Sequence, residues 1–276
     1  MRKLPFTKMH SLGNDFVMLD GVRTPLDLDA ALVRQLADRN HGVGCDQLIV
    51  AQPAIGDADF FMRIFNADGS ESGQCGNGAR CFGRFLIEQG LTECRELEIQ
   101  TISTRIRLTV ADGWQVTAQL APPSFEPRDI PFNAPAVASD YPIVVGGETL
   151  RIGAVSMGNP HAVLIVDDID AAGVDQLGPM LECHCDFPQR TNVGFAQVVD
   201  RQTLRLRVWE RGVGETLACG SGACAAVAVC RLQERIDDTV CVTLPGGLLS
   251  VTWLGHGPIS MNGPAVSVFD GQWPIF

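Results

Sequence analysis

Hydrophobic and polar residues alternate along residues 96–121, with the period of two that is typical of half-buried β-strands. An Asp-Gly pair separates two of the alternating runs, RIRLTV and WQVTAQL, and predicts a hairpin turn between two strands. Along residues 27–42 the apolar residues recur at helical spacing instead, which predicts a helix capped by Asp27 or Asp29. The chain therefore mixes strands and helices.

Residues 122–136 interrupt these patterns, because five prolines fall within this short segment. Proline removes a backbone donor and fixes φ, so the segment cannot continue a helix or a central strand. We expect it to connect two domains, residues 1–120 and residues 121–264.

An internal repeat supports this division. RIFNADGSESGQCGNGARC (63–81) matches RVWERGVGETLACGSGAC (207–224) when the two are placed 144 positions apart. The matched residues are Arg63 with Arg207, Glu71 with Glu215 and Cys75 with Cys219. The repeat predicts a duplicated domain, in which a strand leads through a polar loop to a cysteine and then to a helix.

Cys75 and Cys219 each precede Gly-x-Gly-Ala at the predicted start of a helix. Backbone N–H groups and the helix dipole stabilise an anion there, so we expect the pKa of each thiol to fall towards neutrality. The glycines let a ligand approach the backbone closely and make each helix start a carboxylate-binding site.

Two such helix starts facing each other suit the inversion of a stereocentre by proton transfer. A thiolate on one face of the carbon removes the proton, a thiol on the other face supplies one, and the backbone N–H groups stabilise the developing negative charge. Alternatively, both cysteines are small buried residues at tight turns.

Composition narrows the functional class. The 276 residues carry a formal net charge of −11, which argues against nucleic-acid binding because that requires a basic surface. No apolar run is long enough for a signal peptide or a membrane span, so we expect no membrane association and a cytoplasmic location.

The ten cysteines include no C-x-x-C pair, and we predict neither disulfides nor a metal site. Cys183-His184-Cys185 is the nearest candidate for metal binding, and surface-loop cysteines are the alternative interpretation. A thiol-based redox or metal-binding protein remains a competing hypothesis. Pyridoxal phosphate requires a Schiff-base lysine, and the chain has only Lys3 and Lys8, so we expect no cofactor.

Several motifs resemble those of the diaminopimelate epimerase family and follow the same order over nearly the whole chain. They are KMHSLGNDF, GCDQLI, RIFNADGSE, QCGNGARC, MGNPHAV, TNVGF, ERGVGETLACGSGA and PGG. The resemblance implies an α/β (α+β) fold of two pseudo-symmetric domains, each a curved, mostly antiparallel β-sheet or barrel around a central helix. Residues 265–276 would return to the first domain, and the protein would be a homodimer.

The resemblance also implies the activity: cofactor-independent interconversion of LL- and meso-2,6-diaminopimelate, a small-molecule substrate, on the route to lysine and peptidoglycan. Cys75 and Cys219 would be the acid/base pair, with His161 and Glu210 as neighbours that tune the thiols. A histidine satisfied within its loop is the alternative for His161. The implied substrate-binding residues are Asn14, Gln47, Asn66, Gly76, Asn77, Asn159, Asn192, Glu210, Arg211, Gly220 and Ser221.

Three positions depart from the family pattern. Ser11 stands where the family usually has glycine, Cys45 adds a thiol that we interpret as a packing residue, and Phe269 replaces a tyrosine common at the subunit contact. The remaining alternative function is a racemase or isomerase of the same fold that acts on proline or hydroxyproline.

Overall fold

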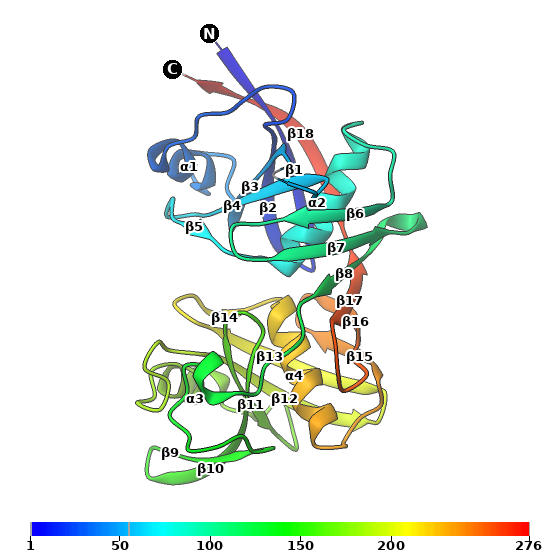
Figure 1. Ribbon diagram of the computed structural model, residues 1–276. Coiled ribbons are helices and arrows are strands. Elements are labelled where there is room, and N and C mark those ends of the chain that lie inside the picture. The colour runs from blue at the N-terminus through cyan, green and yellow to red at the C-terminus, as the bar shows by residue number, and fades with distance from the viewer. Residues whose placement is uncertain (1, 55, 276) are drawn as a thin grey trace. The chain divides into compact units, whose positions relative to one another are not determined.

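The computed structural model describes residues 2–54 and 56–275, and its contacts divide the chain into two compact units (Figure 1). Unit 1 comprises Met1–Leu120 and Asn262–Phe276, and unit 2 comprises Ala121–Met261. No helix in the described parts of the chain is long and apolar enough to cross a membrane.

Unit 1 is a mostly antiparallel sheet with two parallel pairings, β2 with β3 and β4 with β6. Its strands are β1 (Arg2–Ser11), β2 (Asn14–Asp20), β3 (Gln47–Pro53), β4 (Phe60–Asn66), β5 (Glu71–Ser72), β6 (Glu96–Gln100), β7 (Arg105–Val110), β8 (Gln115–Leu120) and β18 (Val266–Ile275). The helix α2 (Gly76–Glu88) contacts β1, β2, β3, β7, β8 and β18. Phe82 and Leu86 of α2 are fully buried, each contributing about 1.5–3 kcal/mol through burial.

Unit 2 is built in the same way, with parallel pairings of β11 with β12 and of β13 with β15. Its elements are β9 (Tyr141–Val145), β10 (Glu148–Ser156), β11 (Pro160–Ile165), α3 (Val174–Glu182), β12 (Asn192–Asp200), β13 (Thr203–Glu210), β14 (Gly214–Thr216), α4 (Gly220–Leu232), β15 (Thr239–Leu244) and β16 (Gly247–Thr252). Strand β17 (Ile259–Pro264) ends in unit 1 and pairs with β8. The sheet encloses α4 on several sides, which explains why this helix is apolar around its circumference.

The order of elements in unit 1 recurs in unit 2. A parallel pair (β2–β3, β11–β12) is followed by an antiparallel strand, a short strand, the helix and a second parallel pairing. The matched arginines also pair with the matched glutamates, Arg63 with Glu71 and Arg207 with Glu215. The predicted mixed α/β class, with a largely antiparallel sheet around a central helix, is confirmed.

The predicted local elements differ from the structure mainly at their ends. The helix expected over 27–42 is α1 (Ala30–Ala37), which Asp29 caps by accepting from the Leu32 amide at 2.8 Å. The Asp-Gly pair at 112–113 lies in the single-turn helix η1 (Asp112–Trp114), where Gly113 adopts a φ of 70°. The proline-rich segment contains only the single turn η2 (Pro127–Asp129) and one isolated bridge from Ser124.

Candidate active site

Cys75 is the N-cap residue of α2, in extended backbone conformation. Its Sγ accepts a hydrogen bond from the Gly78 amide at 3.3 Å, and the side chain is half-buried. A Cβ at Gly78 would lie only 2.5 Å from Ile49 Cδ1, so glycine allows the helix start to pack closely on β3. The predicted thiol at a helix N-terminus is present in unit 1.

Four polar side chains predicted for the site lie at the start of α2 or at the edge of the sheet where β2 and β3 begin and β4 ends. Asn14 Oδ1 lies 4.0 Å from Cys75 Sγ and accepts from Asn77 Nδ2 at 3.2 Å. Gln47 pairs with Asn66 across the strands, and its Nε2 donates to Asn66 Oδ1 at 2.9 Å.

Two residues that the sequence did not indicate support this cluster. Arg80 is fully buried and donates to Asn77 Oδ1 at 2.6 Å and to Ser11 Oγ at 2.8 Å. The Ser11 hydroxyl in turn donates to the Pro264 carbonyl at 2.7 Å. The serine that departs from the family pattern therefore solvates a buried guanidinium and helps to hold Asn77 beside Asn14.

Cys219 occupies the equivalent position in unit 2. It is the N-cap residue of α4, and its Sγ accepts from the Gly222 amide at 3.4 Å. A Cβ at Gly222 would lie 2.9 Å from Val208 Cγ2, so this helix start also requires glycine. Gly76, Asn77, Gly220 and Ser221 occupy the first two helical positions, whose N–H groups a helix does not satisfy internally.

The expected fall in pKa is wrong for Cys219. The side chain is only 5% exposed, and this burial raises the pKa of the thiol well above its usual value. The neighbouring Glu210 carboxylate raises it further, whereas contacts with Ser221 and the Gly222 amide lower it too little to compensate. Cys219 is therefore a neutral thiol that hydrogen-bonds to Glu210.

Glu210 ends β13 and neighbours Cys219, and Arg211 follows it in the turn, near Asn192 at the start of β12. Thr216 Oγ1 donates to Glu210 Oε1 at 2.5 Å. The Arg211 amide donates to Asn192 Oδ1 at 3.0 Å, while Asn192 Nδ2 donates to the Pro160 carbonyl at 2.9 Å. Asn192 thus joins the turn after β13 to the start of β11.

His161 lies in β11 opposite Asn192, the position that Phe16 occupies opposite Gln47 in unit 1. Its Nε2 is 3.1 Å from Asn159 Oδ1. Burial, with a smaller effect from Arg211, lowers the pKa of His161 to about 3, so the imidazole is neutral at physiological pH.

Two buried side-chain polar atoms in the described residues have no hydrogen-bond partner, His161 Nδ1 and Gln47 Oε1. Such atoms are rare in native proteins because an unsatisfied buried polar group costs about 1–3 kcal/mol. Both belong to residues predicted for the site, one in each unit.

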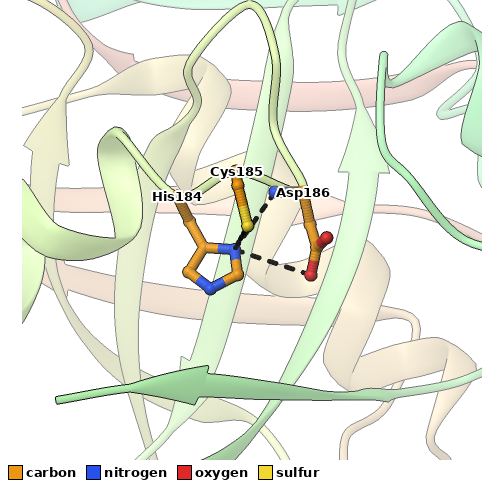
Figure 2. A group of neighbouring side chains, drawn as sticks. All are labelled: His184, Cys185 and Asp186. Atoms are coloured by element: carbon orange, nitrogen blue, oxygen red, sulfur yellow. Dashed lines mark hydrogen bonds and ion pairs between the residues drawn. The ribbon is translucent and has the colours of Figure 1, made fainter.

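The cysteines outside these clusters are buried packing residues or exposed. Burial raises the pKa of Cys45 to about 12, as expected for a packing residue. His184, Cys185 and Asp186 are the one group of potential metal ligands within the described ranges (Figure 2). Both ring nitrogens of His184 already contact the protein, Nδ1 the Asp186 amide at 3.2 Å and Nε2 the Val144 carbonyl at 3.0 Å. These contacts fix the turn after α3 and leave His184 poorly suited to bind a metal.

Comparisons with known proteins identify the family of the chain. A family model described as diaminopimelate epimerase matches residues 6–125 and 153–268. The diaminopimelate epimerase of Thioalkalivibrio sulfidiphilus (strain HL-EbGR7) is 54% identical over 279 residues, covering 99% of this chain and 100% of that protein. That of Pseudomonas entomophila (strain L48) is 52% identical over 271 residues, covering 98% of each. A solved hydroxyproline epimerase from Agrobacterium vitis, 16% identical, shares the fold with a TM-score of 0.71 over 99% of this chain and 92% of that one. The chain belongs to the diaminopimelate epimerase family and is an isomerase.

Proposed function

We propose that the enzyme interconverts LL- and meso-2,6-diaminopimelate by moving protons on opposite faces of one α-carbon, with Cys75 and Cys219 as the acid/base pair. The observation that carries this proposal is the repeated geometry of the two thiols. Each caps a buried helix and accepts from the amide three residues on, at 3.3 Å and 3.4 Å. A structural cysteine would not need this arrangement at both copies of a repeat.

The helix starts provide the electrostatic part of the reaction. When the α-proton leaves, negative charge spreads onto the adjacent carboxylate. N–H groups in the first turns of α2 and α4 are suited to bind that carboxylate and to stabilise the charge. The proposed donors are those of Gly76, Asn77, Gly220 and Ser221.

The protonation states of the thiols must differ for a proton to enter and a proton to leave. Burial and Glu210 keep Cys219 as a thiol, which is the form that donates a proton to the carbanion. Cys75 then acts as the thiolate base in that turnover, and the two cysteines exchange roles in the reverse direction. Glu210 accepts the Cys219 hydrogen bond and is placed to share the proton.

Diaminopimelate has a second amino-acid end, and the polar residues of both clusters suit its charges. An ammonium group would satisfy the Gln47 Oε1 acceptor, which has no partner in the described residues. Arg211 supplies a guanidinium for a carboxylate, and the amides of Asn66 and Asn192 can orient both groups. A substrate with two zwitterionic ends uses these groups more fully than proline or hydroxyproline, each of which has one.

The lysines support a mechanism without pyridoxal phosphate. Lys8 Nζ donates to Asp15 Oδ2 at 2.6 Å and to the Gly44 carbonyl, so an ion pair already engages this amine. Lys3 lies exposed on β1, outside both clusters.

Because diaminopimelate is the proposed substrate, we further propose that the enzyme acts in lysine and peptidoglycan-precursor synthesis in the cytoplasm.

The test is epimerisation of LL-diaminopimelate by purified protein without added cofactor. Cys75→Ala and Cys219→Ala should each lower kcat at least about 10³-fold, because each removes one proton-transfer group. Cys94→Ala, at an exposed cysteine, is the matched control and should retain wild-type activity. Full activity in either active-cysteine variant, or turnover of hydroxyproline in preference to diaminopimelate, would contradict the proposal.

A further inference from the structure

Glu182, the last residue of α3, is a buried carboxylate in an unfavourable position. Its side chain is only 8% exposed. A negative charge at a helix C-terminus faces the negative end of the helix dipole, and burying a carboxylate costs free energy unless hydrogen bonds replace water. The local structure of α3 therefore gives no reason for a glutamate here.

The carboxylate binds one residue near the end of β13 and one residue in the turn that follows it, on either side of Glu210 and Arg211. Glu182 Oε2 accepts from the indole Nε1 of Trp209 at 2.8 Å. Its Oε1 accepts from the Gly212 amide at 2.9 Å and lies 3.6 Å from Arg190 Nη1. The Glu182 carbonyl also accepts from the amide of Thr191, next to Asn192, at 3.1 Å.

The helix surface is shaped to receive the indole ring. Gly178 lies one turn before Glu182 on the same face of α3. A Cβ at Gly178 would lie 2.7 Å from Trp209 Cγ, so the absence of a side chain lets the ring lie against the helix. Gly178 and Glu182 together fix both the position and the rotation of Trp209.

Glu210 and Arg211 lie between Trp209 and Gly212, the two residues that the Glu182 carboxylate binds. Glu210 is the carboxylate beside Cys219, and the Arg211 amide binds Asn192. We propose that Glu182 is a positioning residue, which acts through Trp209 and Gly212 to hold Glu210 against Cys219 and does not touch the substrate. This inference rests on the proposed function.

Glu182→Gln is the direct test, because it keeps the size of the side chain but replaces one acceptor oxygen with a donor. Either the indole N–H or the Gly212 N–H then faces an NH₂ group, and the turn moves. A displacement of about 1 Å can cost about 100-fold in rate. We expect kcat for diaminopimelate to fall about 10- to 100-fold, more than KM rises, with a shifted pH profile of kcat.

Three further variants make the assignment specific. Trp209→Phe keeps the ring against Gly178 but removes the indole N–H, and it should show the same kind of defect, reduced in size. When Glu182→Gln is added to Trp209→Phe, kcat should fall by a smaller factor than when it is added to the wild type, because the Trp209 indole N–H, one of the two donors that conflict with the new NH₂ group, is already absent. Arg190→Asn removes only the ion pair with Glu182, in which the arginine side chain is 60% exposed. Asparagine suits the positive φ of 59° at this position, and this variant should stay within about twofold of wild-type kcat.

The Trp209 indole N–H resonance, assigned with Trp209→Phe, provides a readout that does not depend on activity. Its exchange with solvent should be slow in the wild type and at least about tenfold faster in Glu182→Gln. If wild-type protein fails to epimerise diaminopimelate, the proposed function is wrong, and this exchange rate still decides whether Glu182 fixes the turn. A folded Glu182→Gln with unchanged kcat, pH profile and indole exchange would overturn the inference; if that variant does not fold, an unchanged Trp209→Phe would do so.

Discussion

At the scale of single residues, the chemistry of this enzyme depends on burial as much as on residue type. Cys219 and His161 are both almost completely buried, and in both the neutral form is favoured. For the cysteine this raises the pKa, and for the histidine it lowers the pKa to about 3. Two titratable groups in unit 2 are thus uncharged before the substrate binds.

The low pKa of His161 makes stability depend on pH. The unfolded chain binds a proton to this histidine below about pH 6.5, whereas the folded protein does so only near pH 3. The free energy of unfolding should therefore fall as pH decreases from about 6.5 to 3, by up to about 1.4 kcal/mol per pH unit from this group.

His161→Phe should remove that contribution, because Phe16 occupies the matching position in unit 1. Urea denaturation of both proteins between pH 7 and pH 3 measures the difference, in which the contributions of the carboxylates cancel. Parallel curves for the two proteins would show that folding does not lower the pKa of His161.

Properties that depend on neighbouring residues could be predicted from the sequence, whereas properties that depend on distant segments could not. The helix starts at Cys75 and Cys219, and the Asp29 cap, depend on neighbouring residues and were predictable. The high pKa of Cys219 depends on burial by distant segments, and no local pattern encodes it. The roles of Ser11 and Arg80 were hidden for the same reason, since 69 positions separate these hydrogen-bonded residues.

At the scale of elements, the helix starts depend on glycines that permit close packing. Gly78 in α2 faces Ile49 of β3, and Gly222 in α4 faces Val208 of β13. Helix α3 was not predicted, because it follows a glycine in the left-handed conformation and contains Gly178 and Pro179, which are typical of loops. Its packing against Trp209 compensates for this poor helical propensity.

Gly78→Ala should destabilise the protein although alanine is the better helix former by about 1 kcal/mol. The added Cβ would lie 2.5 Å from Ile49 Cδ1 and 3.3 Å from Cys75 Sγ. Gly83→Ala in the same helix is the control, since its closest contacts are side-chain atoms of Leu108 and Val110 at 3.2 Å. Thermal unfolding should give a clearly lower Tm for Gly78→Ala than for Gly83→Ala, and equal values would contradict the packing argument.

At the scale of the whole molecule, the same order of elements occurs in both units, and the clusters around Cys75 and Cys219 are similar in backbone but differ in their surroundings. Cys75 is half-buried with amide neighbours, whereas Cys219 is buried beside a carboxylate. The backbone geometry around the two thiols is common to both units, as the sequence repeat predicts, whereas the surrounding side chains differ. Gln47 and His161, which within the described residues each have a buried side-chain atom without a hydrogen bond, also lie one in each unit.

We also predict that the enzyme is a homodimer. Val268 and Phe269 of β18 are apolar and 54% and 49% exposed, and the family resemblance implies a subunit contact at Phe269. Phe269→Asp should shift the sedimentation coefficient towards that of a monomer, because a dimer would bury the new charge. A monomeric wild-type protein would refute the prediction.

The most direct test of the central claim is the first turnover of LL-diaminopimelate in D₂O. Thiols exchange with solvent before the reaction, so a two-cysteine mechanism delivers deuterium from one face while the other cysteine removes protium. Newly formed meso product should therefore carry one α-deuterium from the outset, while the remaining substrate stays unlabelled. Product that retains the original protium would show that a single base acts on both faces and would contradict the account.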